Sequence, residues 1–132
     1  MKVRCLYNLG ESLSEYTRKH AGYFNAAKFP INIGDLYNVY GQIIFKGVLE
    51  YLIRGAGENY PSWYPAELFE VVDTQLYLDW HFKYDRDNDI SAIWGFQELV
   101  EDENFLYELE DRNKKAIETF LERKHEIDEF LD

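Results

Sequence analysis

The clearest group of residues that could bind a partner consists of five aromatic side chains and one proline: Tyr37, Tyr40, Tyr60, Trp63, Tyr64 and Pro65. In small β-barrels, exposed aromatic side chains beside an acidic loop grip proline-rich or basic peptides. Glu11 and Glu15 precede the aromatic set and are placed to supply that acidic border. The alternative is that the set forms core, because aromatic residues dominate core burial and this chain contains 3 Trp, 11 Tyr and 9 Phe.

No residue set for catalysis stands out in the sequence. A serine nucleophile of the hydrolase type needs a Gly-x-Ser-x-Gly turn, and no serine in the chain has one. Cys5 alternates with Val3 and Tyr7 in the first predicted strand, where a free thiol is buried and inert. A pair of carboxylates for glycoside hydrolysis is not excluded in a chain with 25 acidic residues, although no pair stands out. The sequence therefore favours a protein that is not an enzyme.

Neither a calcium site nor a zinc site is complete in the sequence. Asp85-x-Asp87-x-Asp89 starts as a calcium loop does, but Ile90 stands where the sharp turn needs Gly. Phe96 stands where such a loop needs a bidentate Glu. Zinc is equally disfavoured, because no Cys or second His lies at ligand spacing from any of the three histidines, His20, His81 and His125. We expect no metal and no cofactor.

Acidic charge is concentrated in the C-terminal part of the chain. Residues 1–73 carry 7 basic and 8 acidic side chains, whereas residues 74–132 carry 7 and 17. Nucleic-acid binding needs a basic face that displaces counterions from phosphate, so this charge excludes nucleic acid as a partner. An acidic surface favours encounter with a basic protein or peptide, or it serves only solubility. We expect an acidic binding face that comprises Glu11, Glu15, Glu108, Glu118 and Glu122.

The composition points to a folded cytoplasmic protein. The apolar content of 46% is enough for a packed core despite the net charge of −11. The sequence holds no run of 18 apolar residues, so no membrane span is expected. The first residues are typical of a β-strand and not of a signal peptide, and the single cysteine cannot form an internal disulfide.

The elements that must position these residues are short strands in residues 1–73. Turn residues Lys46-Gly47 and Gly55–Asn59 separate them. A tight helical turn begins at Pro65, because proline suits the start of a helix and cannot donate a hydrogen bond to a strand. The long loop 8–32 contains a predicted helical turn over 12–20, with Ser12 and Glu15 as a capping box. The predicted strands cover residues 2–7, 36–45, 48–54, 63–64 and 69–72.

These features resemble the Src-homology-3-like small barrel over about residues 1–73. The matching points are the long loop, the two turns, Trp63 and the run Pro65-Ala66-Glu67-Leu68-Phe69 before the last strand. The chain is also similar to uncharacterised small bacterial and phage proteins through Gly34-x-x-Tyr37-x-Val39 and a Trp-Tyr-Pro-x-x-Leu-Phe ending. That family has no assigned chemistry, so the resemblance implies a fold and not an activity.

Residues 74–132 predict a β-hairpin followed by a C-terminal helix. Residues 76–84 alternate apolar and polar side chains, and 90–96 form the second strand of the hairpin. A short helical turn covers 97–100. One helix from about Glu103 to Leu131, capped by Asp102, follows, with acid-before-base pairs Glu108–Arg112, Glu110–Lys114 and Asp111–Lys115. Its apolar stripe should pack on the rest of the protein or form a dimer seam, so we expect a monomer or a weak dimer.

Together the patterns predict an α+β protein in which a small SH3-like β-barrel at 1–73 packs against the hairpin and helix of 74–132. The function that they favour is a non-enzymatic acidic module that binds a basic protein, such as a bacterial immunity protein or inhibitor of a toxin domain. The alternative is a small-molecule-binding or catalytic domain with a pocket between barrel and helix. A flat acidic face would favour the first function, and a deep pocket with converging polar groups would favour the second.

Overall fold

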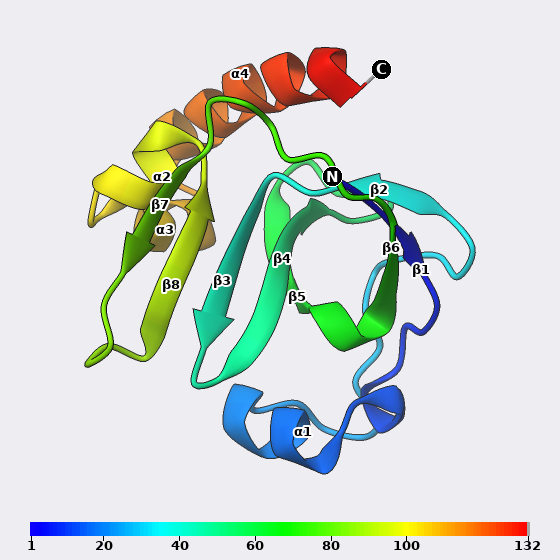
Figure 1. Ribbon diagram of the computed structural model, residues 1–132. Coiled ribbons are helices and arrows are strands. Elements are labelled where there is room, and N and C mark those ends of the chain that lie inside the picture. Colours follow the sequence, from blue (N-terminus) through cyan, green and yellow to red (C-terminus); the bar gives the residue numbers. More distant parts are fainter. Residues whose placement is uncertain (132) are drawn as a thin grey trace.

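The computed structural model describes residues 1–131 and confirms the mixed α+β class, with two antiparallel sheets and a C-terminal helix (Figure 1). The strands are β1 (Lys2–Cys5), β2 (Leu36–Asn38), β3 (Gly41–Phe45), β4 (Val48–Arg54), β5 (Pro61–Pro65), β6 (Phe69–Asp73), β7 (His81–Tyr84) and β8 (Ile90–Gly95). The helices are η1 (Gly10–Ser12), α1 (Glu15–Ala21), η2 (Ala66–Leu68), α2 (Gln97–Glu101), α3 (Phe105–Glu110) and α4 (Lys114–Leu131).

The strands form one sheet in the order β5-β4-β3-β8-β7 and a second in the order β2-β1-β6, so they do not close into a barrel. The predicted strand 36–45 is wrong as one strand, because it divides into β2 and β3 on different sheets. The division falls at Val39 and Tyr40, which are both buried but in two different cores. Their backbone N–H groups also donate to different segments, Val39 to the Met1 carbonyl and Tyr40 to that of Leu52.

The β7–β8 hairpin widens the five-stranded sheet, since β8 pairs with β3 in antiparallel register. The predicted hairpin is confirmed, but its first strand begins at His81 and not at residue 76. Pairing starts where His81 faces Gly95, and the segment before it has no strand partner within the described residues. Leu78 in that segment is consequently 80% exposed.

Each face of the five-stranded sheet covers a different core. Tyr51 and Ile53 of β4 point into the first core, between the two sheets. Leu52, one position along the same strand, points into the second core, against α2, α3 and α4. This follows from the alternation of side chains along a strand. The helix-facing side of β4 is also the side that carries Glu50, which is 4% exposed.

The long loop 8–32 is folded over the end of the sheets around α1 (Figure 1). The predicted capping box at Ser12 is wrong. The helix starts later, at Ser14, whose hydroxyl accepts from the Thr17 N–H. Glu67 of η2 holds this end of α1, because its carboxylate accepts from the Ser14 N–H at 2.9 Å and from the Thr17 hydroxyl.

The predicted continuous helix 103–131 is also wrong, because it breaks into α3 and α4 between Glu110 and Lys114. Arg112 takes a left-handed backbone conformation with φ 59° at the break. Asn113 then caps α4, because its side-chain oxygen accepts from the backbone N–H groups of Lys115 and Ala116. The three acid–base pairs expected across residues 108–115 are not formed, since the break removes their helical spacing.

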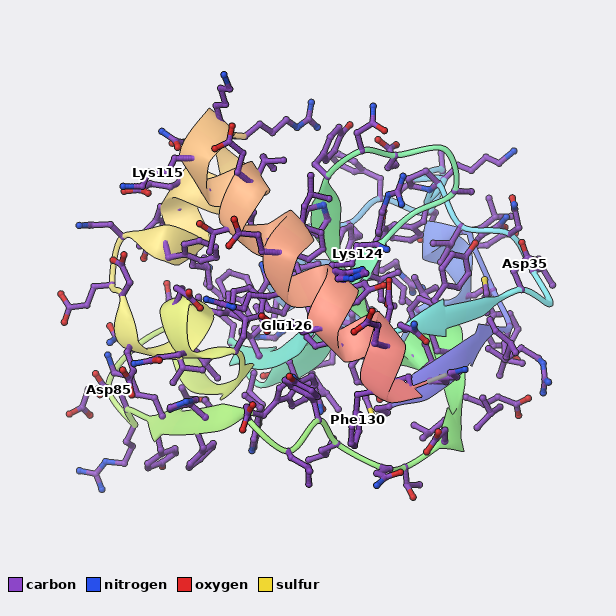
Figure 2. The ribbon with its side chains drawn as sticks, turned by 90° about the horizontal axis from the view of Figure 1, so that it is seen from above. Asp35, Asp85, Lys115, Lys124, Glu126 and Phe130 are labelled. Atoms are coloured by element: carbon purple, nitrogen blue, oxygen red, sulfur yellow. The ribbon has the colours of Figure 1, made fainter. Side chains whose placement is uncertain are left out.

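Helix α4 runs across the molecule (Figure 2). Polar contacts join it to the strands. The Asp128 carboxylate accepts from Asn38 Nδ2 at 2.8 Å, from the Tyr40 hydroxyl at 2.7 Å and from Lys124 Nζ at 2.6 Å. These bonds hold the pKa of Asp128 below its ordinary value even though burial acts in the opposite direction. The network thus joins α4 to the corner between β2 and β3.

Replacing Tyr40 by Phe is expected to lower the free energy of unfolding by about 2 kcal/mol. The change removes one hydrogen bond to a half-buried carboxylate, and such charged bonds contribute roughly 1.5–3 kcal/mol. Urea unfolding at pH 7 measures the difference. Tyr84→Phe is the matched control, since Tyr84 is 62% exposed and should tolerate the change. Equal stability of the two variants would contradict a role for the network.

Candidate functional site

A groove of about 1130 Å³ lies on the helix-facing side of the five-stranded sheet. Strand residues Ile43, Glu50 and Leu52 line it together with Leu106 and Leu109 of α3. The tip of the β7–β8 hairpin and the loop between α2 and α3 border it. We call this feature the acidic groove.

The acidic groove carries far more negative than positive charge. Only two basic side chains line it, Lys83 and Arg112. Carboxylates outnumber them, and these are Glu50, Asp85, Asp87, Asp89, Asp102, Glu103 and Glu110. A concave surface lined by one sign of charge concentrates the field and attracts ligands of the opposite sign.

Glu50 is the one buried acidic residue among those that the structure describes. It lies on β4 between Ile43 of β3 and Pro65 of β5, and it forms no ion pair within residues 1–131. Burial and, to a smaller extent, the Glu110 carboxylate raise the pKa of Glu50 to about 7, although the hydrogen bond from Tyr23 acts in the opposite direction. A carboxyl group in this position is half neutral and half charged near pH 7.

Two neighbours of Glu50 come from distant parts of the chain. Tyr23 follows α1, and burial together with Glu50 raises the pKa of its hydroxyl, which therefore remains a neutral donor. Glu110 ends α3, and burial and the adjacent Asp111 raise the pKa of its carboxyl group. The fold thus gathers two carboxyl groups and a phenol at one point in the groove.

Aromatic side chains form the other part of the lining. Trp63 lies on β5 directly opposite Leu52 of β4, on the same face of the sheet as Glu50. Tyr60 precedes β5, and the Arg112 guanidinium lies 3.6 Å from the centroid of its ring. This cation–π contact shows that the aromatic wall of the groove already holds one cationic group.

Only two of the six residues in the predicted aromatic set reach the groove, Tyr60 and Trp63. Tyr40 and Tyr64 are 4% and 3% exposed, and Pro65 is also fully buried, so these three side chains lie in the core. Tyr37 packs against the first core, and its hydroxyl accepts from the Asn32 N–H. The binding role of the set stays a prediction.

The five predicted acidic residues are exposed but do not line the groove: Glu11, Glu15, Glu108, Glu118 and Glu122. They are spread over η1, α1, α3 and α4. Sequence reasoning missed Glu50, Tyr23 and Glu110. A signal for Glu50 was present, because it is the single charged residue in the apolar run from Val48 to Ile53.

The histidines and the aspartate-rich loop have structural partners. His81 Nδ1 lies 3.2 Å from a Glu101 oxygen, and His125 Nε2 lies 3.1 Å from one of Glu129. His20 stacks on Tyr16. In the hairpin loop, Asp85 accepts from its neighbours Asp87 and Asn88. Within residues 1–131, no group of three or more His, Cys, Asp or Glu side chains is arranged to hold a metal ion.

Cys5 is buried in the first core, and burial raises the pKa of its thiol, so the thiol stays protonated and unreactive. Among residues 1–131, no helix combines the length and the apolar character that crossing a bilayer requires.

Fold and site together define a mixed α+β protein with an acidic, partly aromatic groove on one sheet face. Comparisons with protein-family models, with curated proteins and with solved structures find no match to this chain. The function is therefore argued from the charge and geometry of the acidic groove.

Proposed function

We propose that the protein is a non-enzymatic binding module that receives a basic segment of another protein in the acidic groove. The observation that carries the proposal is Glu50, a buried acid that lines the groove and has no cationic partner among the described residues. A buried carboxylate is unfavourable unless an opposite charge pairs with it. A lysine or arginine side chain of a partner would supply that charge.

The wider lining supports the same kind of ligand. Carboxylates along the rim would steer a basic segment into place, and electrostatic complementarity of this sort raises association rates. Trp63 also lines the groove, and an aromatic ring attracts cationic groups. The resemblance of residues 1–73 to Src-homology-3-like barrels is part of the proposal, because such folds bind peptides in aromatic-lined grooves.

A concrete version of this role is an immunity or inhibitor protein that acts in the cytoplasm of a bacterium and neutralises a basic toxin domain. Such a partner would present a basic surface, and the net charge of −11 on this chain would speed its capture. The protein would act as a monomer, with α4 packed on its own sheet.

A blocked peptide of alternating glycine and lysine tests the proposal. It should bind the protein at about 20 mM salt with a Kd in the micromolar range and weaken at least tenfold at 0.5 M salt, because exposed charges are screened. Intrinsic tryptophan fluorescence, to which Trp63 contributes, and titration calorimetry report the binding. The matched glycine–glutamate peptide should not bind. Equal binding of the two peptides, or none by either, would refute the proposal.

A second candidate is a small-molecule-binding or catalytic domain, which one observation favours. Glu50 has a pKa of about 7 and lies beside a second carboxyl group in a groove, as a general acid or base does. A thermal-shift screen of neutral sugars and metabolites addresses it. Stabilisation by a neutral compound, lost in Glu50→Gln, would favour this candidate over the peptide-binding module.

A further inference from the structure

Glu50 differs from the other carboxylates of the acidic groove in its surroundings. It is 4% exposed, whereas Asp85, Asp102 and Glu103 on the rim are partly or fully exposed. It projects from the sheet on the same face as Leu52, and Ile43 lies directly opposite it on β3. The floor of the groove is therefore an apolar surface with one acid set into it.

Among residues 1–131, no charged group on a surrounding element neutralises this acid. The neighbour from α3 is Glu110, which repels it, and the neighbour that follows α1 is Tyr23, which is neutral. Lys83 of β7 and Arg112 line the groove but form no ion pair with Glu50. Arg112 is placed over Tyr60 instead.

We infer that the floor of the acidic groove is a subsite for one lysine or arginine side chain, whose cationic group pairs with the Glu50 carboxylate. The methylene stem of that side chain lies against Leu52 and Trp63, which face each other on the neighbouring strands. The inference rests on the proposed function, and it specifies which side chain of the partner binds in the groove.

The subsite links binding to protonation. In the empty groove, burial raises the pKa of Glu50 to about 7, so at pH 6 the group is mostly neutral. A cation bound beside it favours the charged form and lowers the pKa again. Binding at pH 6 should therefore release roughly 0.5–1 proton per peptide.

Titration calorimetry of the blocked glycine–lysine peptide at pH 6, in two buffers of different ionisation enthalpy, measures this release. Glu50→Gln should abolish it and weaken binding at pH 8 about tenfold, since the charged acceptor is lost. Glu110→Gln is the control, and it should retain at least half of the release. Circular dichroism of each variant establishes that it is folded.

The outcomes separate this inference from the proposed function. Binding without proton release by the unmodified protein, or an unchanged release in Glu50→Gln, overturns the subsite and leaves the acidic groove as a binding surface. Equal loss of release in both variants overturns the assignment to Glu50. Failure of the unmodified protein to bind the peptide at low salt overturns the proposed function itself.

Discussion

Replacing Glu50 by Gln should raise the free energy of unfolding by about 3 kcal/mol at pH 8 and leave it nearly unchanged at pH 4. The pKa of Glu50 is raised from 4.5 in the unfolded chain to about 7 in the fold. Between these values the folded state binds more protons than the unfolded state. The stability of the native protein therefore falls as the pH rises from about 4.5 to 7, and Gln removes that loss.

Urea unfolding at pH 4, 6 and 8 measures the effect. Glu108→Gln is the control, because Glu108 is exposed on α3 and should change stability by less than about 0.5 kcal/mol at each pH. A Glu50→Gln variant that is destabilised equally at all three pH values would show that the carboxylate is satisfied in the folded protein. That result would also remove the main support for the acidic groove as a cation site.

A stabilising substitution at Glu50 would indicate that the acid is kept for binding and not for stability. Buried charges that destabilise a free protein are retained where function requires them, and removing them raises stability at the expense of activity. The same variant is expected to bind the lysine peptide more weakly. Opposite changes in stability and affinity at one residue are a result that a purely structural acid would not produce.

Replacing Phe120 by Ala should lower the free energy of unfolding by 3–5 kcal/mol. Phe120 is 0% exposed and lies at the centre of the second core, with its ring edge-to-face with that of Tyr40 at 5.4 Å between centroids. The truncation removes that contact and leaves a cavity between α4 and the sheet. A loss of this size is a large part of the total stability of a small domain.

Leu121→Ala is the matched control for this prediction. Leu121 is the next residue on α4 but is 43% exposed, so its truncation should change the free energy of unfolding by less than about 1 kcal/mol. Guanidinium unfolding of both variants gives the comparison. Similar losses would mean that α4 does not pack on the sheet through the Phe120 face.

The strands and turns with strong local signals could be predicted from the sequence. Val48–Arg54 is a strand because its β-branched and aromatic residues favour a pleated, half-buried surface. Lys46-Gly47 forms the preceding turn with positive φ angles of 48° and 81°, which is where a Gly is needed. The β7–β8 hairpin and α2 could also be predicted, because their sequence signals lie within a few neighbouring residues.

Breaks within long patterned segments could not be predicted in this way. The alternation across 36–45 suits one strand, but the Val39 and Tyr40 side chains are buried in different cores. The apolar stripe across 103–131 suits one helix, but the chain breaks into α3 and α4 around Arg112. In both cases burial against a distant element outweighs local propensity, which is worth less than 1 kcal/mol per residue.

The candidate site could be predicted from the sequence only in part. Alternation along β4 places Glu50 opposite Tyr51 and Ile53, so the sequence fixes which side of the strand it takes. Tertiary packing alone decides that helices cover this side. It also brings Tyr23, 27 residues before Glu50, and Glu110, 60 residues after it, close to the Glu50 carboxylate.

The sequence by itself determined the mixed α+β class of the fold and the strong acidity of the chain. Only the tertiary structure decided which aromatic residues are core and which line a groove, because burial depends on what packs over each sheet face. It also decided which of 25 acidic residues lies buried without a cation, since desolvation is a property of the assembled surroundings and not of the residue.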